Sequence, residues 1–466
     1  MLTIILVFVY FAVILLVGFF AGKRTKDMSS YMVGGRNLGV WVVSLGIMAA
    51  VMSGWTWLGN PGSAYSEGYS AVITYTAFSP LGLVLSYFLI AKPVRIISEK
   101  FNCYTLADIL AVRWNDNKSI RFLSGIIILI GSATYLVSQW VSMGTAVQAA
   151  LGTGYKESVI LGAIIITMYI IAGGMLASMW TNFIQMIIMF FVAGILIVAG
   201  FAAVGGFTSM NEQIAEIDAQ MISPWHTGDN GLSMCFVLSY TIFMLMMAYG
   251  GQPAVNTKFM MIKDKKLLKW SPFISVIALI IGTFMVYVGI QGRIFVEKGM
   301  IPAPERQDTI LLDVISHLIP AGLADLFLIA ILAAVMSTAE THLFHSSTSV
   351  IQDMVIKSLN IKIKDHKMLM LTRLTMAGIA VITVVLSISP PSLISLIGTQ
   401  AFGTFCAGFA PVLYLGLRWK RMSAKAAVAG MSVGLAAGGL FPIINNLLFD
   451  GTLLSNWTIG GLDVVT

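Results

Sequence analysis

The stretch SLGIMAAVMSGWTWLGNPG, residues 44–62, contains the feature that decides the fold. Most of it is apolar, but Ser53-Gly54 interrupts the apolar run, and the segment 59–62, which includes a proline, ends it. Glycine is conformationally permissive and proline cannot donate a backbone hydrogen bond, so both residues interrupt helices. The stretch therefore predicts an apolar helix that is broken near its middle.

A second stretch, FMLMMAYGGQPAVNTKFM at 243–260, has the same character. Its Gly250-Gly251-Gln252-Pro253 sequence places two flexible residues shortly before one that lacks an amide proton. One such break alone is equally consistent with a plain kink, because glycine and proline are frequent in membrane helices. Breaks at matching positions of two repeated halves favour a binding site instead.

The composition indicates that both stretches belong to a membrane protein. The chain has 466 residues, of which 58% are hydrophobic and 11% charged, and its mean hydropathy is +0.88. A water-soluble domain of this length does not tolerate such a surface. We expect about twelve membrane-spanning helices, near 2–21, 37–58, 69–91, 119–151, 157–179, 181–205, 234–262, 271–296, 321–353, 370–390, 392–417 and 426–448.

The distribution of Lys and Arg over the loops predicts the orientation of the chain. Alternate loops hold 24 of the 28 residues, including the runs from Lys92 to Arg121 and from Lys258 to Lys269. Cytoplasmic loops carry this excess, so the N-terminus is expected outside. The net charge of +7 then reflects the topology in a lipid bilayer and does not indicate nucleic acid. We expect a multi-pass protein of the cell membrane, and nothing in the sequence implies an obligate protein partner.

The expected helices divide into two halves of opposite orientation. Residues 37–205 form a five-helix block that begins in the cytoplasm, and residues 234–417 form another that begins outside. An external loop at 206–233 joins them, while 1–36 and 418–466 add one flanking helix each. This is the pattern of an all-α inverted repeat, in which the first helix of each half is the broken one.

The sequence shows no pattern of an enzyme active site. We find no zinc-binding HExxH motif, no opposed aspartates and no serine–histidine pair with a supporting motif. Cys103, Cys235 and Cys406 are too widely spaced to suggest disulfides or a metal site. We therefore expect neither catalysis nor a cofactor.

Six motifs together resemble the sodium:solute symporter family in their order and spacing. They are YMVGGRNLG at 31–39, MSGW at 52–55, TLADIL at 105–110, GGMLASMWTNFIQ at 173–185, GGQP at 250–253 and ILAAVMST at 331–338. Within the family, IDAQMISP at 217–224 and SPPSLISLIGTQAFG at 389–403 are similar to the pantothenate permeases, whereas YGGQP and MSGW are similar to the proline symporters.

The resemblance implies a LeuT-type core of five plus five helices, with Na⁺ and substrate held at the helix breaks. Such symporters commonly have thirteen membrane-spanning helices. A chain with about twelve is expected either to lack the last helix or to be truncated. The ten-helix core is expected to be complete in both cases.

The resemblance also implies a main sodium site. Na⁺ is a hard cation that prefers oxygen ligands, which carbonyls freed by a helix break and hydroxyls of another helix provide. Carried onto this sequence, the site comprises the carbonyls of Ala49, Met52 and Ala334 and the hydroxyls of Ser337 and Thr338. The alternative is that both hydroxyls merely bond to carbonyls of their own helix.

Two positions depart from the family. Val51 stands where proline symporters carry an aspartate, and Asn182 stands where several members place the aspartate of a second sodium site. These departures alone predict a single Na⁺ per cycle. However, Glu340 and Thr341 occupy the positions of that aspartate's partners and share a helix face with Ser337. We hypothesise that Asn182, Glu340 and Thr341 bind a second cation or a proton; the alternative is that Glu340 is solvated or pairs with a nearby histidine or lysine.

The candidate substrate contacts lie around the two breaks. They are Ser53, Gly54 and Trp55 at the first break, Tyr249, Gln252 and Pro253 at the second, and Gln139 with Trp140 on a helix beside them. No Lys or Arg falls in the middle of an expected core helix, which disfavours multiply charged substrates. An aromatic residue in a membrane helix usually serves packing, which is the alternative role for Trp140.

Together these patterns predict a secondary active transporter that couples Na⁺ to the uptake of a small organic solute by alternating access. Pantothenate and proline are the leading substrates, and both rest on the resemblance. A solute-responsive membrane sensor and a Na⁺ channel of the same fold are the alternatives.

Overall fold

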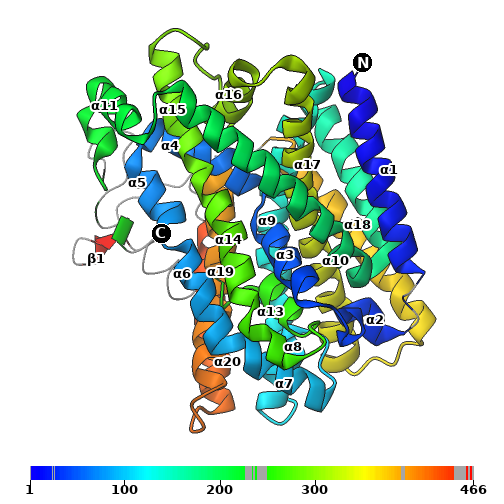
Figure 1. The fold of residues 1–466 in the computed structure, drawn as a ribbon. Helices are drawn as coiled ribbons and strands as arrows, with labels where there is room; N and C mark the ends of the chain where they lie inside the picture. The colour runs from blue at the N-terminus through cyan, green and yellow to red at the C-terminus, as the bar shows by residue number, and fades with distance from the viewer. Residues whose placement is uncertain are drawn as a thin grey trace.

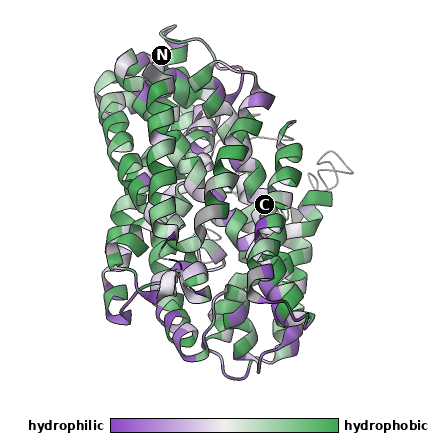
Figure 2. Cartoon of the chain, turned by 90° about the vertical axis from the view of Figure 1, so that its right-hand side faces the viewer, coloured by the Kyte–Doolittle hydropathy of each residue, from purple (hydrophilic) through white to green (hydrophobic). Residues whose placement is uncertain are grey.

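The computed structural model describes residues 2–23, 25, 27–225, 234, 237–238, 249–389, 394–444, 458–459 and 462–463. In this part of the chain the fold is helical, apart from a short antiparallel pair of strands, β1 (Thr458–Ile459) and β2 (Leu462–Asp463). Most of the helices run side by side along one axis (Figure 1). Apolar residues cover their length, and hydrophilic residues gather mainly towards the two ends of the bundle (Figure 2).

The α-helices are α1 (Leu2–Gly22), α2 (Met28–Val33), α3 (Val40–Val51), α4 (Asn60–Glu67), α5 (Tyr69–Ala71), α6 (Ser79–Ser86), α7 (Lys92–Phe101), α8 (Leu106–Arg113), α9 (Lys118–Leu151), α10 (Tyr155–Ala203), α11 (Phe207–Ile217), α13 (Pro253–Phe259), α14 (Ser271–Phe284), α15 (Val286–Glu297), α16 (Ile310–Leu318), α17 (Ala321–Thr348), α18 (Asp365–Ser387), α19 (Ile394–Gly416) and α20 (Ala424–Leu435).

Shorter helical turns of other types connect them. Those with 3₁₀ geometry are η1 (Gly34–Arg36), η5 (Ala219–Ile222), η6 (Lys265–Lys269) and η7 (Gln307–Thr309). Those with π geometry are η2 (Trp55–Gly59), η3 (Val72–Ala77), η4 (Tyr87–Ala91), η8 (Ser349–Ser358) and η9 (Ala436–Leu440).

Among the described residues, eight helices are long and apolar enough to cross a membrane, or nine if the bent pair formed by α3 and the segment 55–67 counts as one. Of the remaining expected spans, 157–179 lies in α10 and 392–417 corresponds to α19. Much of 234–262 lies outside the described residues. We refer to the end of the bundle that carries α2, α7 and α8 as the basic end; α11 and α16 lie at the opposite end (Figure 1).

The first expected break is confirmed, but the helix does not end where the sequence suggested. The helix axis bends by 57° between Val51 and Trp55. Beyond the bend the chain stays helical through Pro61. The helix ends only at Glu67 and is followed by Gly68, whose φ is +61°. Pro61 lies just after the π turn η2, Trp55–Gly59, where α4 begins, and the helical conformation continues through it.

The boundary between the fifth and sixth expected helices also differs from the prediction. A break near residue 180 was expected, whereas the chain kinks at Gly174, inside the continuous segment assigned to α10. Gly174 has a φ of +62°, and a Cβ at this position would lie 2.6 Å from the ring of Tyr31. Glycine alone adopts this conformation readily and leaves room for the ring, so the kink belongs at this residue.

Helix α17 forms the centre of the bundle. It packs against α9, α10, α3 and α18, and every residue from Ile329 to Thr348 is buried. This buried run includes several polar side chains, among them Ser337, Thr338, Glu340 and His342. Buried polar groups require partners, and those partners define the candidate site.

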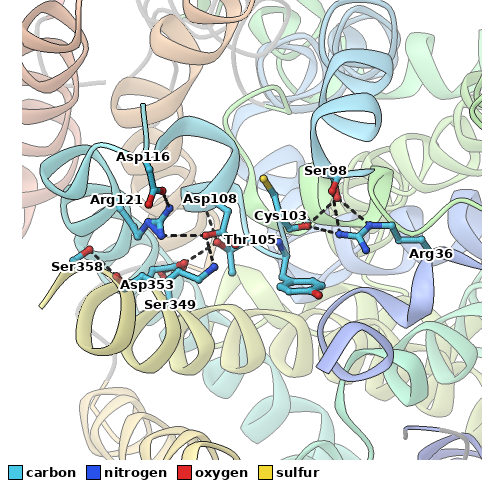
Figure 3. A network of polar contacts seen from close by, with 12 residues as sticks. Arg36, Ser98, Cys103, Thr105, Asp108, Asp116, Arg121, Ser349, Asp353 and Ser358 are labelled. Carbon is cyan, nitrogen blue, oxygen red and sulfur yellow. Dashed lines mark hydrogen bonds and ion pairs between the residues drawn. The ribbon is translucent and has the colours of Figure 1, made fainter. Parts of the chain in front are cut away.

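Charged residues tie three segments together at the basic end (Figure 3). Asp108 on α8 lies 2.6 Å from Lys357 Nζ on η8 and 3.4 Å from Arg121 Nη1 on α9. The Thr105 hydroxyl donates to Asp353 Oδ1 at 2.8 Å. These contacts hold the end of the central helix against the α7–α8 segment and close this side of the bundle.

At the opposite end, η7 packs over the segment that follows the first break. A Cβ on Gly62 would lie 3.0 Å from the backbone of Gln307 and Asp308. The Asp308 carboxylate accepts a hydrogen bond from the Ile394 amide at the start of α19, and it lies 3.4 Å from Arg306. Burial raises the pKa of Asp308 from 3.8 to about 6.

We expect this carboxyl group to make stability depend on pH. Its folded-state pKa lies above the unfolded value, so the folded protein binds the proton more tightly, and the free energy of unfolding falls as the pH rises from about 4 to about 6. The expected loss is roughly 2 to 3 kcal/mol. Asp308→Asn should abolish that loss in thermal unfolding at pH 4.5 and pH 7. The exposed Glu305→Gln variant is the control, and a decline of the same size in Asp308→Asn would contradict the assignment.

Candidate functional site

The end of α3 presents backbone carbonyls to the central helix. Because the helix stops at Val51, carbonyls in its last turn lack amide partners within the helix. The Ser337 hydroxyl donates to the Ala49 carbonyl at 2.6 Å, and the Thr338 hydroxyl lies 3.3 Å from the Ala50 carbonyl. Hydroxyl groups of α17 thus provide hydrogen-bond donors for carbonyls at the broken end of α3.

The same two hydroxyls also reach a carbonyl of their own helix. Ser337 Oγ and Thr338 Oγ1 lie 3.0 Å and 3.1 Å from the Ala334 carbonyl. Three carbonyls and two hydroxyls therefore converge where α3 breaks, without a formal charge among them. Uncharged oxygen ligands at a helix break suit a monovalent hard cation.

Four of the five predicted members of the main cation site come together here: Ala49, Ala334, Ser337 and Thr338. Met52 follows α3 directly, and its amide donates to the Met48 carbonyl at 2.8 Å. Ala50 was missed by the sequence prediction, although an abrupt end of the helix leaves neighbouring carbonyls exposed together.

Two of the three members of the predicted second cation site, Glu340 and Asn182, meet at one hydroxyl group. Glu340 is fully buried, and its Oε1 accepts a hydrogen bond from Ser178 Oγ of α10 at 2.5 Å. Asn182 Nδ2 lies 3.4 Å from the same hydroxyl. The Thr341 hydroxyl donates to the Ser337 carbonyl at 2.8 Å, a bond within its own helix. Ser178 was missed by the sequence prediction, although it precedes Asn182 by one helical turn.

Lys258 lies where the loop count did not place it. The sequence prediction assigned it to a cytoplasmic loop, but it belongs to α13 and none of its surface is exposed. Its Nζ donates to the Gly46 carbonyl of α3 at 2.8 Å. The expected span 234–262 already included Lys258, so the error lay in counting it with the loop, and α13 carries this lysine into the bundle.

Around the first break, side chains of α9 bind the exposed backbone. The Gly54 amide donates to Gln139 Oε1 at 3.0 Å, and the Ser53 hydroxyl lies 2.9 Å from the Tyr135 hydroxyl. The Trp55 amide donates to Ser53 Oγ at 3.2 Å. The structure therefore brings Ser53, Gly54, Trp55 and Gln139 together, and it adds Tyr135, which the sequence prediction did not include.

At the GGQP motif the described residues form a turn followed by a helix, as the second expected break requires on its C-terminal side. Tyr249 to Gly251 form a turn, Gln252 is extended, and α13 begins at Pro253, so proline occupies the first position of a helix. Asn256 Nδ2 bridges the carbonyls of Gly250 and Gln252 at 2.7 Å and 2.9 Å. Most of the residues before Tyr249, on which the first part of this expected helix falls, lie outside the described residues.

Trp140 does not join the residues at the breaks by a hydrogen bond. Its indole Nε1 donates to Thr383 Oγ1 of α18 at 2.8 Å, so its polar group serves packing between α9 and α18. The aromatic ring of Phe402 on α19 lies near both breaks instead. Its ring centroid is 5.1 Å from that of Trp55 and 6.4 Å from that of Tyr249. These rings place α19 beside both breaks.

A cavity of about 30 Å³ lies beside the first break. It is lined by Val51, Trp55, Thr56, Asn60, Tyr75, Thr76, Ser79, Tyr249, Leu279, Thr283 and Phe402. In the described part of the chain, Trp55 Nε1 and Asn60 Oδ1 have no hydrogen-bond partner. The cavity holds a water molecule or two but no organic solute, so a solute requires the surrounding rings to move.

The polar layer at two helix breaks, one preceding α4 and one preceding α13, is the arrangement of an ion-coupled transporter of the inverted-repeat type. Residues 31–434 match the model of the sodium:solute symporter family. The chain belongs to the sodium:solute symporter family. Its all-α fold is LeuT-like. The family that the six sequence motifs predicted is therefore confirmed.

Two relatives and one solved structure are similar to this chain over most of its length. The osmoregulated proline transporter OpuE of Bacillus subtilis is 33% identical over 437 residues, which cover 92% of this chain and 86% of the relative. The high-affinity proline transporter PutP of the same organism is 33% identical, with 91% and 88% covered. A Na⁺-coupled sialic acid symporter in a substrate-bound, outward-open state has a TM-score of 0.74 at 20% identity, and the match covers 100% of this chain and 96% of that one.

Proposed function

We propose that this symporter carries proline, or another small solute with one carboxylate, into the cell together with Na⁺. The observation that carries the proposal is the cluster in which Ser337 and Thr338 meet the freed carbonyls of α3. Proline is the first candidate because OpuE and PutP, two relatives that match over most of the chain, are proline transporters. Pantothenate, favoured by part of the sequence, is the second substrate to test.

The main site provides a physical basis for coupling. A cation held between α3 and α17 would join the broken helix to the central helix, and Trp55, just after the break, lines the adjacent cavity. If Na⁺ and the solute both bind one conformation better than the other, each ligand raises the affinity of the protein for the second ligand. Net movement of one positive charge inward then releases about 2.3 kcal/mol per 100 mV.

The orientation follows from the charges. We propose that the basic end faces the cytoplasm, that the N-terminus lies outside, and that residues 37–205 and 234–417 are the two inverted repeats. The network of Asp108, Arg121 and Lys357 then closes the inner side. Solute and Na⁺ would enter past η7 and leave past this network.

The test is uptake of radiolabelled proline by proteoliposomes that contain the purified protein. With an inward Na⁺ gradient we expect internal proline to exceed the external concentration, and with K⁺ instead of Na⁺ we expect no accumulation. Unlabelled pantothenate serves as the competing substrate. Na⁺ flux without solute accumulation would favour a channel, and proline binding without flux would favour a sensor; either result contradicts the proposal.

A further inference from the structure

The π turn η2 brings two polar side chains of one segment to the same cavity. The Asn60 amide donates to the Trp55 carbonyl, and this bond makes the turn wider than a turn of an α-helix. In an α-helix, residues with this spacing point about 140° apart. Here Trp55 and Asn60 both line the cavity of about 30 Å³ beside the first break. Such turns are frequent at functional sites.

Each of these two side chains has a polar atom without a partner. Trp55 is 5% exposed and Asn60 is 6% exposed. Within the described residues, neither Trp55 Nε1 nor Asn60 Oδ1 has a hydrogen-bond partner. A buried polar group that lacks a partner is destabilising, and a ligand that bonds to it removes this cost. The two unpaired atoms therefore indicate a ligand that binds in this cavity.

The two atoms differ in the groups that they can bind. The indole N–H of Trp55 only donates, and the amide oxygen of Asn60 only accepts. A carboxylate suits the indole, and an N–H group that carries a positive charge suits the amide oxygen. The described residues that line the cavity are all uncharged, which disfavours a ligand with a net charge. A small zwitterion satisfies both atoms and has no net charge.

The neighbours of Trp55 hold its indole ring in place. A Cβ on Gly398 of α19 would lie 3.0 Å from the indole ring, so the helix packs directly against it. The ring centroids of Phe402 and Tyr75 lie 5.1 Å and 6.3 Å from that of Trp55. These apolar surroundings keep water away, which strengthens a hydrogen bond to a charged group. The indole N–H is therefore a fixed donor.

We propose that Trp55 binds the carboxylate and Asn60 the ammonium group of an amino acid, and that Asn60 selects such solutes against carboxylates without an ammonium group. The proposal rests on the proposed function as a Na⁺ symporter of a small solute and specifies the class of that solute. Proline belongs to this class, because its secondary amine is protonated at neutral pH. Pantothenate does not, because its nitrogen is an uncharged amide. Asn60 was not among the residues predicted from the sequence.

The experiment compares two solutes of the same shape. L-Proline and (S)-tetrahydrofuran-2-carboxylate share the ring and the carboxylate, but the second has an ether oxygen in place of the ammonium group. Affinities are measured in Na⁺ from the thermal stabilisation of the purified protein. The wild type should bind proline about 10- to 100-fold more tightly, as expected for one hydrogen bond to a charged group.

The variants separate the two roles. Asn60→Leu should bring the ratio of the two affinities close to one, mainly by weakening the binding of proline. Trp55→Phe keeps a ring but removes the N–H donor, so both affinities should fall and their ratio should stay that of the wild type. Thr372→Val is the control, because Thr372 is buried on α18 and its hydroxyl donates to the Met368 carbonyl of the same helix. Both affinities should be unchanged in this variant.

Three results would overturn the proposal. They are a wild-type ratio close to one, a wild-type ratio in a folded Asn60→Leu variant, and unchanged affinities in Trp55→Phe. The first and third remain decisive if Asn60→Leu does not fold. If proline does not bind, alanine and propionate form the second pair, and a failure of both amino acids to bind also overturns the proposal. Na⁺-driven uptake of pantothenate would then leave the symport function standing, whereas binding with the expected ratio but without accumulation would contradict that function alone.

Discussion

Ser337→Ala should lower the apparent Na⁺ affinity by about 10- to 100-fold, the range typical when a group of a metal site is removed. The hydroxyl contacts carbonyls on both sides of the site, Ala49 of α3 at 2.6 Å and Ala334 of α17 at 3.0 Å. Its loss removes a ligand and also the direct link between the two helices. A hundredfold loss corresponds to about 2.7 kcal/mol.

The measurement is the Na⁺ dependence of solute uptake, together with the Na⁺ concentration that protects the purified protein from thermal unfolding. By linkage the half-saturating solute concentration at low Na⁺ should rise, and it should recover at high Na⁺. Ser346→Ala is the control, because Ser346 lies on the same helix, is equally buried and donates to His342 and Leu343 of that helix. Equal effects in both variants would contradict the assignment of the site.

Asp108→Ala should lower the free energy of unfolding by about 3 kcal/mol, the lower end of the range for breaking a buried ion pair. Asp108 and Arg121 are almost completely buried, whereas Lys357 is partly exposed. Removal of the carboxylate leaves two cations facing each other at the basic end. Asp108 Oδ2 also accepts a hydrogen bond from the Tyr104 amide, just before α8, so the turn that precedes the helix loses a hydrogen bond as well.

Denaturant unfolding in detergent micelles tests this expectation, and the control is Asp116→Ala. Asp116 also pairs with Arg121, but its side chain is 68% exposed, so its loss should change stability by less than about 1 kcal/mol. We also expect Asp108→Ala to favour the inward-open state, measured as faster labelling of cysteines introduced into η8. If the free energy of unfolding of Asp108→Ala equals that of the wild type, the network of Asp108, Arg121 and Lys357 does not stabilise the fold.

The main cation site was predictable because its ligands are encoded locally. Ser337 and Thr338 are adjacent on one helix, and the break after Val51 is visible as Ser53-Gly54 in the sequence. Ala50 was missed because the choice of carbonyl depends on the rotation of α3 against α17, which no one-dimensional pattern contains. The end of the first broken helix was misplaced because proline was interpreted as a stop, whereas the helix continues through Pro61 to Glu67.

Lys258 shows a different limit. Counting basic residues between apolar runs assigned it to a loop, and the count was still adequate to predict topology. Its burial depends on the packing of α13 against α3, where its Nζ donates to the Gly46 carbonyl, a residue far away in the sequence. Trp140 shows the same limit of a one-dimensional pattern: its position next to Gln139 suggested a shared role, but adjacent residues on a helix point about 100° apart, and its indole donates to Thr383.

The oxygen groups that converge at the break of α3 carry no formal charge, since they are hydroxyls of Ser337 and Thr338 and backbone carbonyls. A cation bound there keeps its charge, so a cycle that carries one Na⁺ and a zwitterionic solute moves one charge, and at 100 mV the potential alone supports an accumulation of about 50-fold. A second mobile ion would square that ratio but would double the sodium that the cell must pump out again. The number of ions bound in each cycle thus sets the balance between steep accumulation from dilute surroundings and a low consumption of the sodium gradient in richer ones.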